Sequence, residues 1–148
     1  MRSFIDTSVL VYADSAGAGA KQSCASALIA HCLRGGDGVI STQVLHEFVN
    51  AAIRKLALPL DLVRAWVCLY SRFETVNASP AAVLEALNRH ALHTSSIWDA
   101  LIVQAARQSG CEQLLTEDLQ AGTAIGGVRI VNPFDVPSPL KTRRAKTR

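Results

Sequence analysis

Short apolar runs alternate with longer amphipathic stretches along this chain, and this alternation limits its possible folds more than any other feature. Hydrophobic residues in the longer stretches recur at the three- and four-residue spacing of helices. Strands that alternate with helices favour an α/β domain with a parallel sheet, in which the crossovers between strands are right-handed. The runs with the length and composition of strands are residues 3–5, 39–40, 73–76, 114–115 and 128–131.

Capping residues mark the starts and ends of the helices. Asp6, Ser41 and Ser96 are suitable N-caps for the helical patterns that follow them. Ser79-Pro80 is a strong helix start, because proline suits the first helical position. Gly35-Gly36 is typical of a helix C-terminus. We expect helices over residues 9–12, 24–34, 42–53, 61–71, 80–92 and 96–110, and a short helical turn after Thr116.

The composition is that of one ordinary folded domain. Of the 148 residues, 49% are hydrophobic and 18% are charged, so extensive disorder is not expected. We expect residues 1–136 to form the domain and residues 137–148 to form a flexible basic tail after a proline-containing segment. No apolar run approaches the roughly 18 residues of a membrane span, so no membrane association is expected.

The net charge and the cysteines also limit the function classes. Five of the 15 basic residues lie at 141–148, which leaves 10 basic and 12 acidic residues in the rest of the chain, a net of −2 against +3 for the whole. The tail is therefore the expected long-range attractor of an anionic partner. The four cysteines include no Cys-x-x-Cys pair, so we expect reduced thiols and a cytoplasmic protein.

Four acidic residues follow the predicted strands or lie in the helices after them. Asp6 follows the first strand, and Asp118 follows the fourth. Glu47 lies about two turns beyond the second strand, and Asp99 lies in the first turn of the helix that Ser96 begins. Ligands of open parallel sheets bind beyond the carboxyl ends of the strands, so these acids are predicted to converge there. Clustered carboxylates repel one another unless a hard cation such as Mg²⁺ or Mn²⁺ neutralises them.

Each acid taken singly also has a structural interpretation. Asp6 and Asp118 can favour a helix start, and Ser96-x-x-Asp99 resembles a capping box. Glu47 can be ordinary surface charge. The alternative function is therefore a non-catalytic α/β module that binds RNA or a protein. Against it, Asp99 and Glu47 neighbour apolar residues of their own helices, where an unpaired carboxylate is costly.

Other catalytic motifs are incomplete. His46-Glu47 begins a His-Glu-x-x-His zinc motif, but Asn50 replaces the second histidine. No phosphate-binding glycine-rich motif is present, so a P-loop nucleotidase is excluded. A phosphatase of the haloacid dehalogenase type needs a second aspartate where Ser8 stands.

Four segments together resemble the acidic motifs of PIN-domain ribonucleases, and their order and spacing resemble those of the VapC-like toxins in VapBC-type toxin–antitoxin pairs. The resemblance spans roughly residues 3–132. It implies a sheet of parallel strands ordered 3-2-1-4-5 and Mg²⁺- or Mn²⁺-dependent hydrolysis of RNA. It also implies a cognate antitoxin and a homodimer. The segments are FIDTSVLVY at 4–12, VLHEF at 44–48, SIWDALI at 96–102 and LLTED at 114–118.

The resemblance also implies roles for individual residues. Glu117 falls at the variable position of the Thr-x-Asp motif and is not assigned to the metal. Arg54 and Lys55 lie on the helix of Glu47 and are candidate RNA phosphate contacts, although a favourable charge at the helix end explains them equally well. The implied metal-binding and catalytic acids are Asp6, Glu47, Asp99 and Asp118, and the implied auxiliary hydroxyls are Thr7, Ser8, Ser96 and Thr116.

Overall fold

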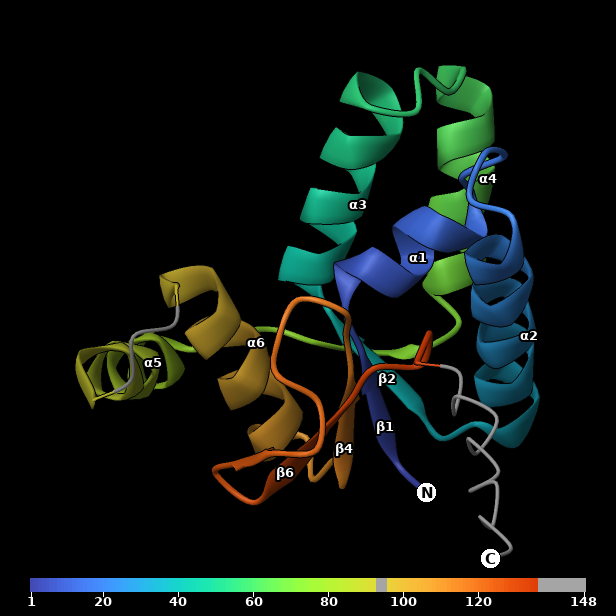
Figure 1. Cartoon of the computed structure of the whole chain (residues 1–148). Helices are drawn as coiled ribbons and strands as arrows, with labels where there is room; N and C mark the ends of the chain where they lie inside the picture. Colours follow the sequence, from blue (N-terminus) through green and yellow to red (C-terminus); the bar gives the residue numbers. More distant parts are fainter. Residues whose placement is uncertain (93–95, 136–148) are drawn as a thin grey trace, which may run out of the picture.

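A six-stranded sheet forms the centre of the chain in the computed structural model, which describes residues 1–92 and 96–135 (Figure 1). The strand order is β3-β2-β1-β4-β6-β5. Neighbouring strands from β3 to β6 pair in parallel, and β5 pairs antiparallel with β6. The strands are β1 (Ser3–Ile5), β2 (Gly38–Ser41), β3 (Glu74–Val76), β4 (Gln113–Leu115), β5 (Ala124–Ile125) and β6 (Val128–Val131).

The five strands expected from the sequence are present and lie in the expected order, with β6 as the fifth. The predicted parallel sheet is confirmed for these five strands, and β5 adds a short antiparallel edge strand that was not predicted. The two residues of β5 are too few for a recognisable hydrophobic periodicity in the sequence. Gly126 and Gly127 form the turn between β5 and β6, with φ of 59° and 86°, as a tight two-residue hairpin requires.

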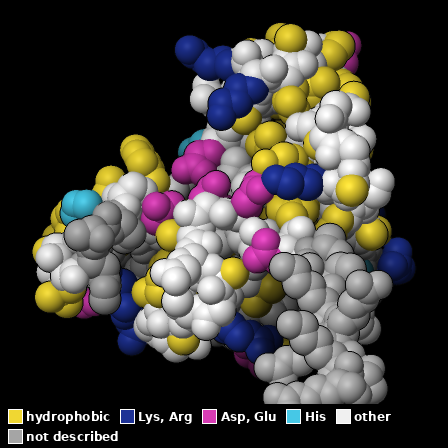
Figure 2. Space-filling model, viewed as in Figure 1, with side chains coloured by type: hydrophobic (Ala, Val, Ile, Leu, Met, Phe, Trp, Pro, Cys, Tyr) yellow, Lys and Arg dark blue, Asp and Glu magenta, His cyan; other side chains and the backbone are white. Residues whose placement is uncertain are grey.

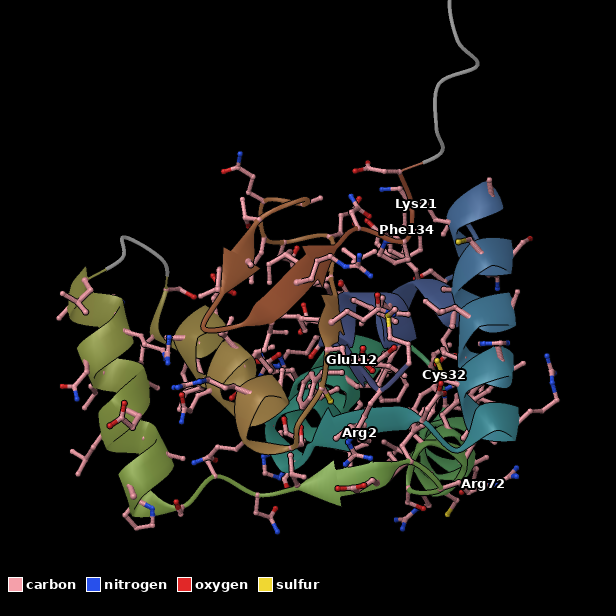
Figure 3. The ribbon with its side chains drawn as sticks, turned by 90° about the horizontal axis from the view of Figure 1, so that it is seen from below. Arg2, Lys21, Cys32, Arg72, Glu112 and Phe134 are labelled. Atoms are coloured by element: carbon pink, nitrogen blue, oxygen red, sulfur yellow. The ribbon has the colours of Figure 1, made fainter. Side chains whose placement is uncertain are left out.

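Helices lie on both sides of this sheet, with α5 and α6 on one side and α2 on the other (Figures 1 and 3). The helical turn expected after Thr116 does not form, since residues 117–119 are bends. The predicted tail at 137–148 lies outside the described residues. The helices are α1 (Thr7–Ala13), α2 (Ala20–Gly35), α3 (Thr42–Arg54), α4 (Leu60–Tyr70), α5 (Pro80–Leu92) and α6 (Ile97–Gln108).

The predicted N-caps Asp6, Ser41 and Ser96 are confirmed, and each of them lies directly before the first residue of its helix. The side chain of Asp6 accepts a hydrogen bond from the amide of Thr7 at the start of α1. Ser41 caps α3 and Ser96 caps α6 by accepting a hydrogen bond from the amide three residues further on, that of Val44 and of Asp99. The strands β1 and β2 lead into α1 and α3 through Asp6 and Ser41, so the first turns of these two helices stand at the carboxyl edge of the sheet.

The core lies between the sheet and the helices. All residues of β1 and β2 are buried, as expected for central strands covered on both faces. Phe48 of α3 and Tyr70 of α4 are fully buried and meet edge to face, with ring centroids 5.1 Å apart. Burial of one such side chain stabilises the fold by about 1.5–3 kcal/mol. This ring contact packs α3 against α4.

All four cysteines are free thiols, and no helix within the described ranges has the length and hydropathy needed to cross a membrane.

Candidate active site

The carboxyl ends of β1 and β4 bring Asp6 and Thr116 together. The two strands pair with Ile5 opposite Leu115, so the residues that follow them are neighbours. Asp6 is only 7% exposed, and both of its carboxylate oxygens accept hydrogen bonds. The amide of Thr7 donates to Oδ1 at 2.8 Å, and the hydroxyl of Thr116 donates to Oδ2 at 2.7 Å. The buried carboxylate is therefore held in one orientation.

The hydroxyl of Thr116 also positions the segment that carries Asp118. It accepts a hydrogen bond of 3.1 Å from the amide of Asp118, whose side chain is exposed. A single hydroxyl thus connects Asp6 with the loop after β4. The auxiliary role of Thr116 stays a prediction, and these two hydrogen bonds are the contacts through which it would act.

Glu47 reaches the same edge from α3. The hydroxyl of Thr7 donates to its Oε2 at 2.7 Å, and the side-chain amide of Gln43 donates to its Oε1 at 2.9 Å. Thr7 therefore contributes its amide to Asp6 and its hydroxyl to Glu47. Gln43 was not identified from the sequence, although its position one turn before Glu47 is the usual spacing of helical side-chain pairs.

Asp99 approaches from α6. Ser96 caps this helix by accepting a hydrogen bond of 3.1 Å from the amide of Asp99. The half-buried carboxylate of Asp99 raises the pKa of Asp118, which shows that the two charges interact. Ser96 thus orients the turn that carries Asp99.

Repulsion between the acids is visible in the pKa values of Asp6 and Asp118. The pKa of Asp6 is raised to about 6: burial has the largest effect and the charges of Asp118 and Glu47 add to it, against the two hydrogen bonds that lower it. Burial also raises the pKa of Asp118, with added effects of Asp99, Glu117 and Glu47. Figure 2 shows acidic side chains gathered on the face where the N-terminal ends of α1, α3 and α6 meet. The four predicted acids therefore share one electrostatic site.

Glu117 differs from these four acids because Lys21 compensates its charge. The two side chains form an ion pair, and Lys21 lowers the pKa of Glu117. The ammonium of Lys21 also lies over the rings of Tyr12 and Phe134, at 4.7 and 5.7 Å from their centroids (Figure 3). Ser8 accepts a hydrogen bond of 3.4 Å from the amide of Glu117. The sequence holds no signal for the Lys21 pair, because 96 residues separate its members.

An open cavity of about 450 Å³ lies beside the acids. Lys55 lines it together with Glu47 and Asp118, and the charge of Lys55 lowers the pKa of Asp118. Arg54 is exposed in the last turn of α3 and is not among the residues that line this cavity. Of the two predicted phosphate contacts, Lys55 is the one that the fold brings to the acids.

The donor set suits a hard divalent cation. Carboxylate oxygens are the preferred ligands of Mg²⁺, which commonly uses one or two carboxylates together with water and substrate phosphates. Within residues 1–92 and 96–135, no three His, Cys, Asp or Glu side chains are close enough to enclose an ion by themselves. Asp6 and Glu47 each keep free lone pairs beside the hydroxyls that hold them, so water and substrate oxygens would complete the coordination.

If Asp6 is a metal ligand as predicted, replacing Thr116 with valine should weaken divalent-metal binding by about 10- to 100-fold, the usual effect of losing a hydrogen bond to a metal ligand. The variant removes the bond that lowers the pKa of Asp6, so this pKa should rise above its present value of about 6. Calorimetric titration with Mn²⁺ at several pH values measures both effects. Thr116→Ser keeps the hydroxyl and should bind Mn²⁺ like the unmodified chain; equal affinity in the valine variant would contradict the assigned role.

Comparisons with known proteins agree with this architecture. The family model of the PIN domain matches residues 3–122. A search of curated proteins finds no significant match. Among solved structures, the chain is similar to the toxin VapC20 of Mycobacterium tuberculosis, described as cleaving the sarcin–ricin loop, with a TM-score of 0.60 and 22% identity over 78% of this chain and 89% of that one.

Two further solved structures cover more of the chain. A toxin–antitoxin complex from Klebsiella pneumoniae has a TM-score of 0.67 and 18% identity, over 90% of this chain and 99% of that one. FitAcB from Neisseria gonorrhoeae has a TM-score of 0.63 and 17% identity, with the same coverage. At these identities, the similarity demonstrates a shared fold.

Proposed function

Starting from the premise that this chain belongs to the PIN domain family, we propose that it is a metal-dependent endoribonuclease and the toxin of a toxin–antitoxin pair. The observation that carries the proposal is the gathering of Asp6, Glu47, Asp99 and Asp118, from four distant segments, at the carboxyl edge of the sheet. Separate helix caps would not need to lie close together, whereas here the charges of Asp118 and Glu47 raise the pKa of Asp6, and the charges of Asp99 and Glu47 raise the pKa of Asp118. Holding like charges close together destabilises the folded chain, and a bound cation would remove this repulsion.

In this mechanism, Asp6, Glu47, Asp99 and Asp118 would hold Mg²⁺ or Mn²⁺. When bound there, such an ion would supply a water of lowered pKa and would stabilise the leaving oxygen of a phosphodiester. Thr116 and Thr7 keep the carboxylates of Asp6 and Glu47 in fixed orientations through their hydroxyls. Lys55 provides a positive charge at the cavity wall for an RNA phosphate. The expected products carry a 5′-phosphate and a 3′-hydroxyl, with no covalent enzyme intermediate.

The proposal includes a cognate antitoxin, a homodimer and a cytoplasmic location. The toxin–antitoxin complex from Klebsiella pneumoniae, which shares the fold, supports the first of these. A mostly apolar groove of about 460 Å³ along α3 and α4 adds a surface suited to a protein partner. Phe48 and Tyr70 are fully buried and contribute to the core rather than to such a surface, while Trp66 stacks on Tyr70 at 5.9 Å.

The test of this function is cleavage of a 5′-labelled single-stranded RNA with Mg²⁺, with Mn²⁺ and with EDTA. We expect cleavage only with a divalent ion, together with measurable Mn²⁺ binding by calorimetry. Asp99→Asn should reduce both cleavage and Mn²⁺ affinity at least about tenfold, because it removes one negative ligand. A non-catalytic module would show neither cleavage nor metal binding, and this outcome would refute the proposal.

A further inference from the structure

We propose that a second cavity, beside the acids, binds one unpaired nucleobase of the RNA and stacks it on Trp98. The cavity has a volume of about 680 Å³ and lies where the N-terminal half of α3, residues 77–78 and α6 meet. This inference deepens the proposed nuclease function and rests on it for the identity of the ligand. It adds a site that determines which base stands next to the cleaved bond.

The cavity is continuous with the acidic site. Glu47 and Asn50 line both this cavity and the smaller one that contains Asp118. Trp98 is the residue before Asp99 on α6. Gln43 joins the two regions, because its side-chain amide donates to Glu47 Oε1 at 2.9 Å and to the carbonyl oxygen of Trp98 at 3.4 Å. A nucleotide whose phosphate is at the acids therefore has its base within reach of this cavity.

The lining favours a base over a phosphate. Among the described residues that line the cavity there is no lysine or arginine, and the one charged group is the carboxylate of Glu47, which repels anions. The other polar groups are amides, an imidazole and two hydroxyls, from Gln43, Asn50, Asn77, His46, Ser41 and Thr42. Such groups both donate and accept hydrogen bonds, as the edge of a nucleobase requires. The hydroxyl of Thr42 donates to Asn77 Oδ1 and so fixes the direction of this amide.

Trp98 supplies the stacking surface. Its side chain is 61% exposed, although large apolar residues are commonly covered. It lines the cavity together with the apolar residues Leu101 and Ala105. Base–aromatic stacking commonly changes affinity by about 10- to 100-fold for each base. An apolar side chain from a protein partner would also cover Trp98, but it would leave the amides around it without partners.

The inferred base must be unpaired. A base within a duplex is stacked on both faces and has its pairing edge occupied, so it cannot enter the cavity beside Trp98. The inference therefore predicts a preference for single-stranded segments, loops or bulges over regular duplex. It also predicts that the base preference at one position changes when the amides of Gln43 or Asn50 are altered.

The first measurement needs no catalysis. In EDTA, a Trp66→Phe variant leaves Trp98 as the single tryptophan, and its fluorescence is titrated with decamers of adenylate, cytidylate and uridylate. We expect quenching, with different affinities for the three decamers. Fluorescence anisotropy of labelled decamers should show binding to Trp98→Ala weakened about 10- to 100-fold and binding to Trp98→Phe largely restored. Leu84→Ala, another exposed apolar position, is the matched control and should bind normally.

The second measurement separates this inference from the nuclease proposal. With Mg²⁺, Trp98→Ala should raise KM for a decamer and change the preferred base, with a smaller effect on kcat. Cleavage by an unmodified chain, combined with no quenching and an unchanged KM in Trp98→Ala, would overturn the base site and assign the cavity to a protein partner. Quenching without any cleavage would support the base site and refute the nuclease.

Discussion

Asp6→Asn is expected to lower kcat/KM for RNA cleavage by about 100- to 1,000-fold, the equivalent of several kcal/mol of metal-dependent stabilisation. Asp6 is the most buried of the four acids and directly follows the central strand β1. Its substitution removes one negative charge from the proposed metal site while preserving the shape of the side chain. Cleavage of a labelled RNA at saturating Mg²⁺, measured alongside Mn²⁺ affinity, tests this expectation.

The same substitution is expected to stabilise the chain when no metal is present. The pKa of Asp6 is raised from 3.8 to about 6, so the folded state holds this proton more tightly than the unfolded state. The free energy of unfolding should therefore fall as the pH rises from about 4 to about 6. The shift is equivalent to about 3 kcal/mol, and the loss of carboxylate hydrogen bonds offsets part of it. In EDTA at pH 7, we expect Asp6→Asn to gain about 1–2 kcal/mol.

Urea denaturation with EDTA at pH 4, 5, 6 and 7 measures this effect. The pH dependence between 4 and 6 should be weaker in Asp6→Asn than in the unmodified chain. Asp61→Asn is the matched control, because it removes the same charge from an exposed position in the first turn of α4 and should change stability by less than about 0.5 kcal/mol. A destabilised Asp6→Asn would show that Asp6 acts chiefly as a helix cap.

Phe48→Ala is expected to reduce the free energy of unfolding by about 3–5 kcal/mol, the usual cost of truncating a fully buried phenylalanine. Phe48 is 0% exposed, and its ring meets that of Tyr70 at an angle of 85°. It also follows Glu47, so the space left by the missing ring would loosen the helix that holds this proposed metal-binding acid. We expect weaker Mn²⁺ binding even at temperatures where the variant is folded.

Urea denaturation and Mn²⁺ calorimetry at 10 °C check both parts of this prediction. Phe48→Leu fills much of the cavity and should cost about 1–1.5 kcal/mol with near-normal metal affinity. A loss below about 1 kcal/mol in Phe48→Ala would contradict the importance of the contact between α3 and α4. Normal Mn²⁺ affinity in a strongly destabilised variant would show that Glu47 is held by Thr7 and Gln43 alone.

Local patterns in the sequence were enough for the fold class and for the main elements. Alternating apolar runs and capped amphipathic helices predicted the α/β sheet, because burial and backbone hydrogen bonding impose their periods on each segment separately. Short elements escaped this reasoning. The two residues of β5 depend on the Gly126-Gly127 turn and on pairing with β6, and residues 117–119 bend where a helical turn was expected.

The sequence by itself determined which residue types stand at the ends of the strands, so it identified the four acids and the hydroxyls beside them. Only the tertiary structure decided which of these groups meet. The pairing of β1 with β4 joins Asp6 to Thr116 across 110 residues, and the docking of α1 and α3 joins Thr7 to Glu47. The tertiary structure also placed Lys21 against Glu117, and it placed Trp98 beside an open cavity. Such contacts depend on strand register and helix packing, which arise when distant segments bury a common core.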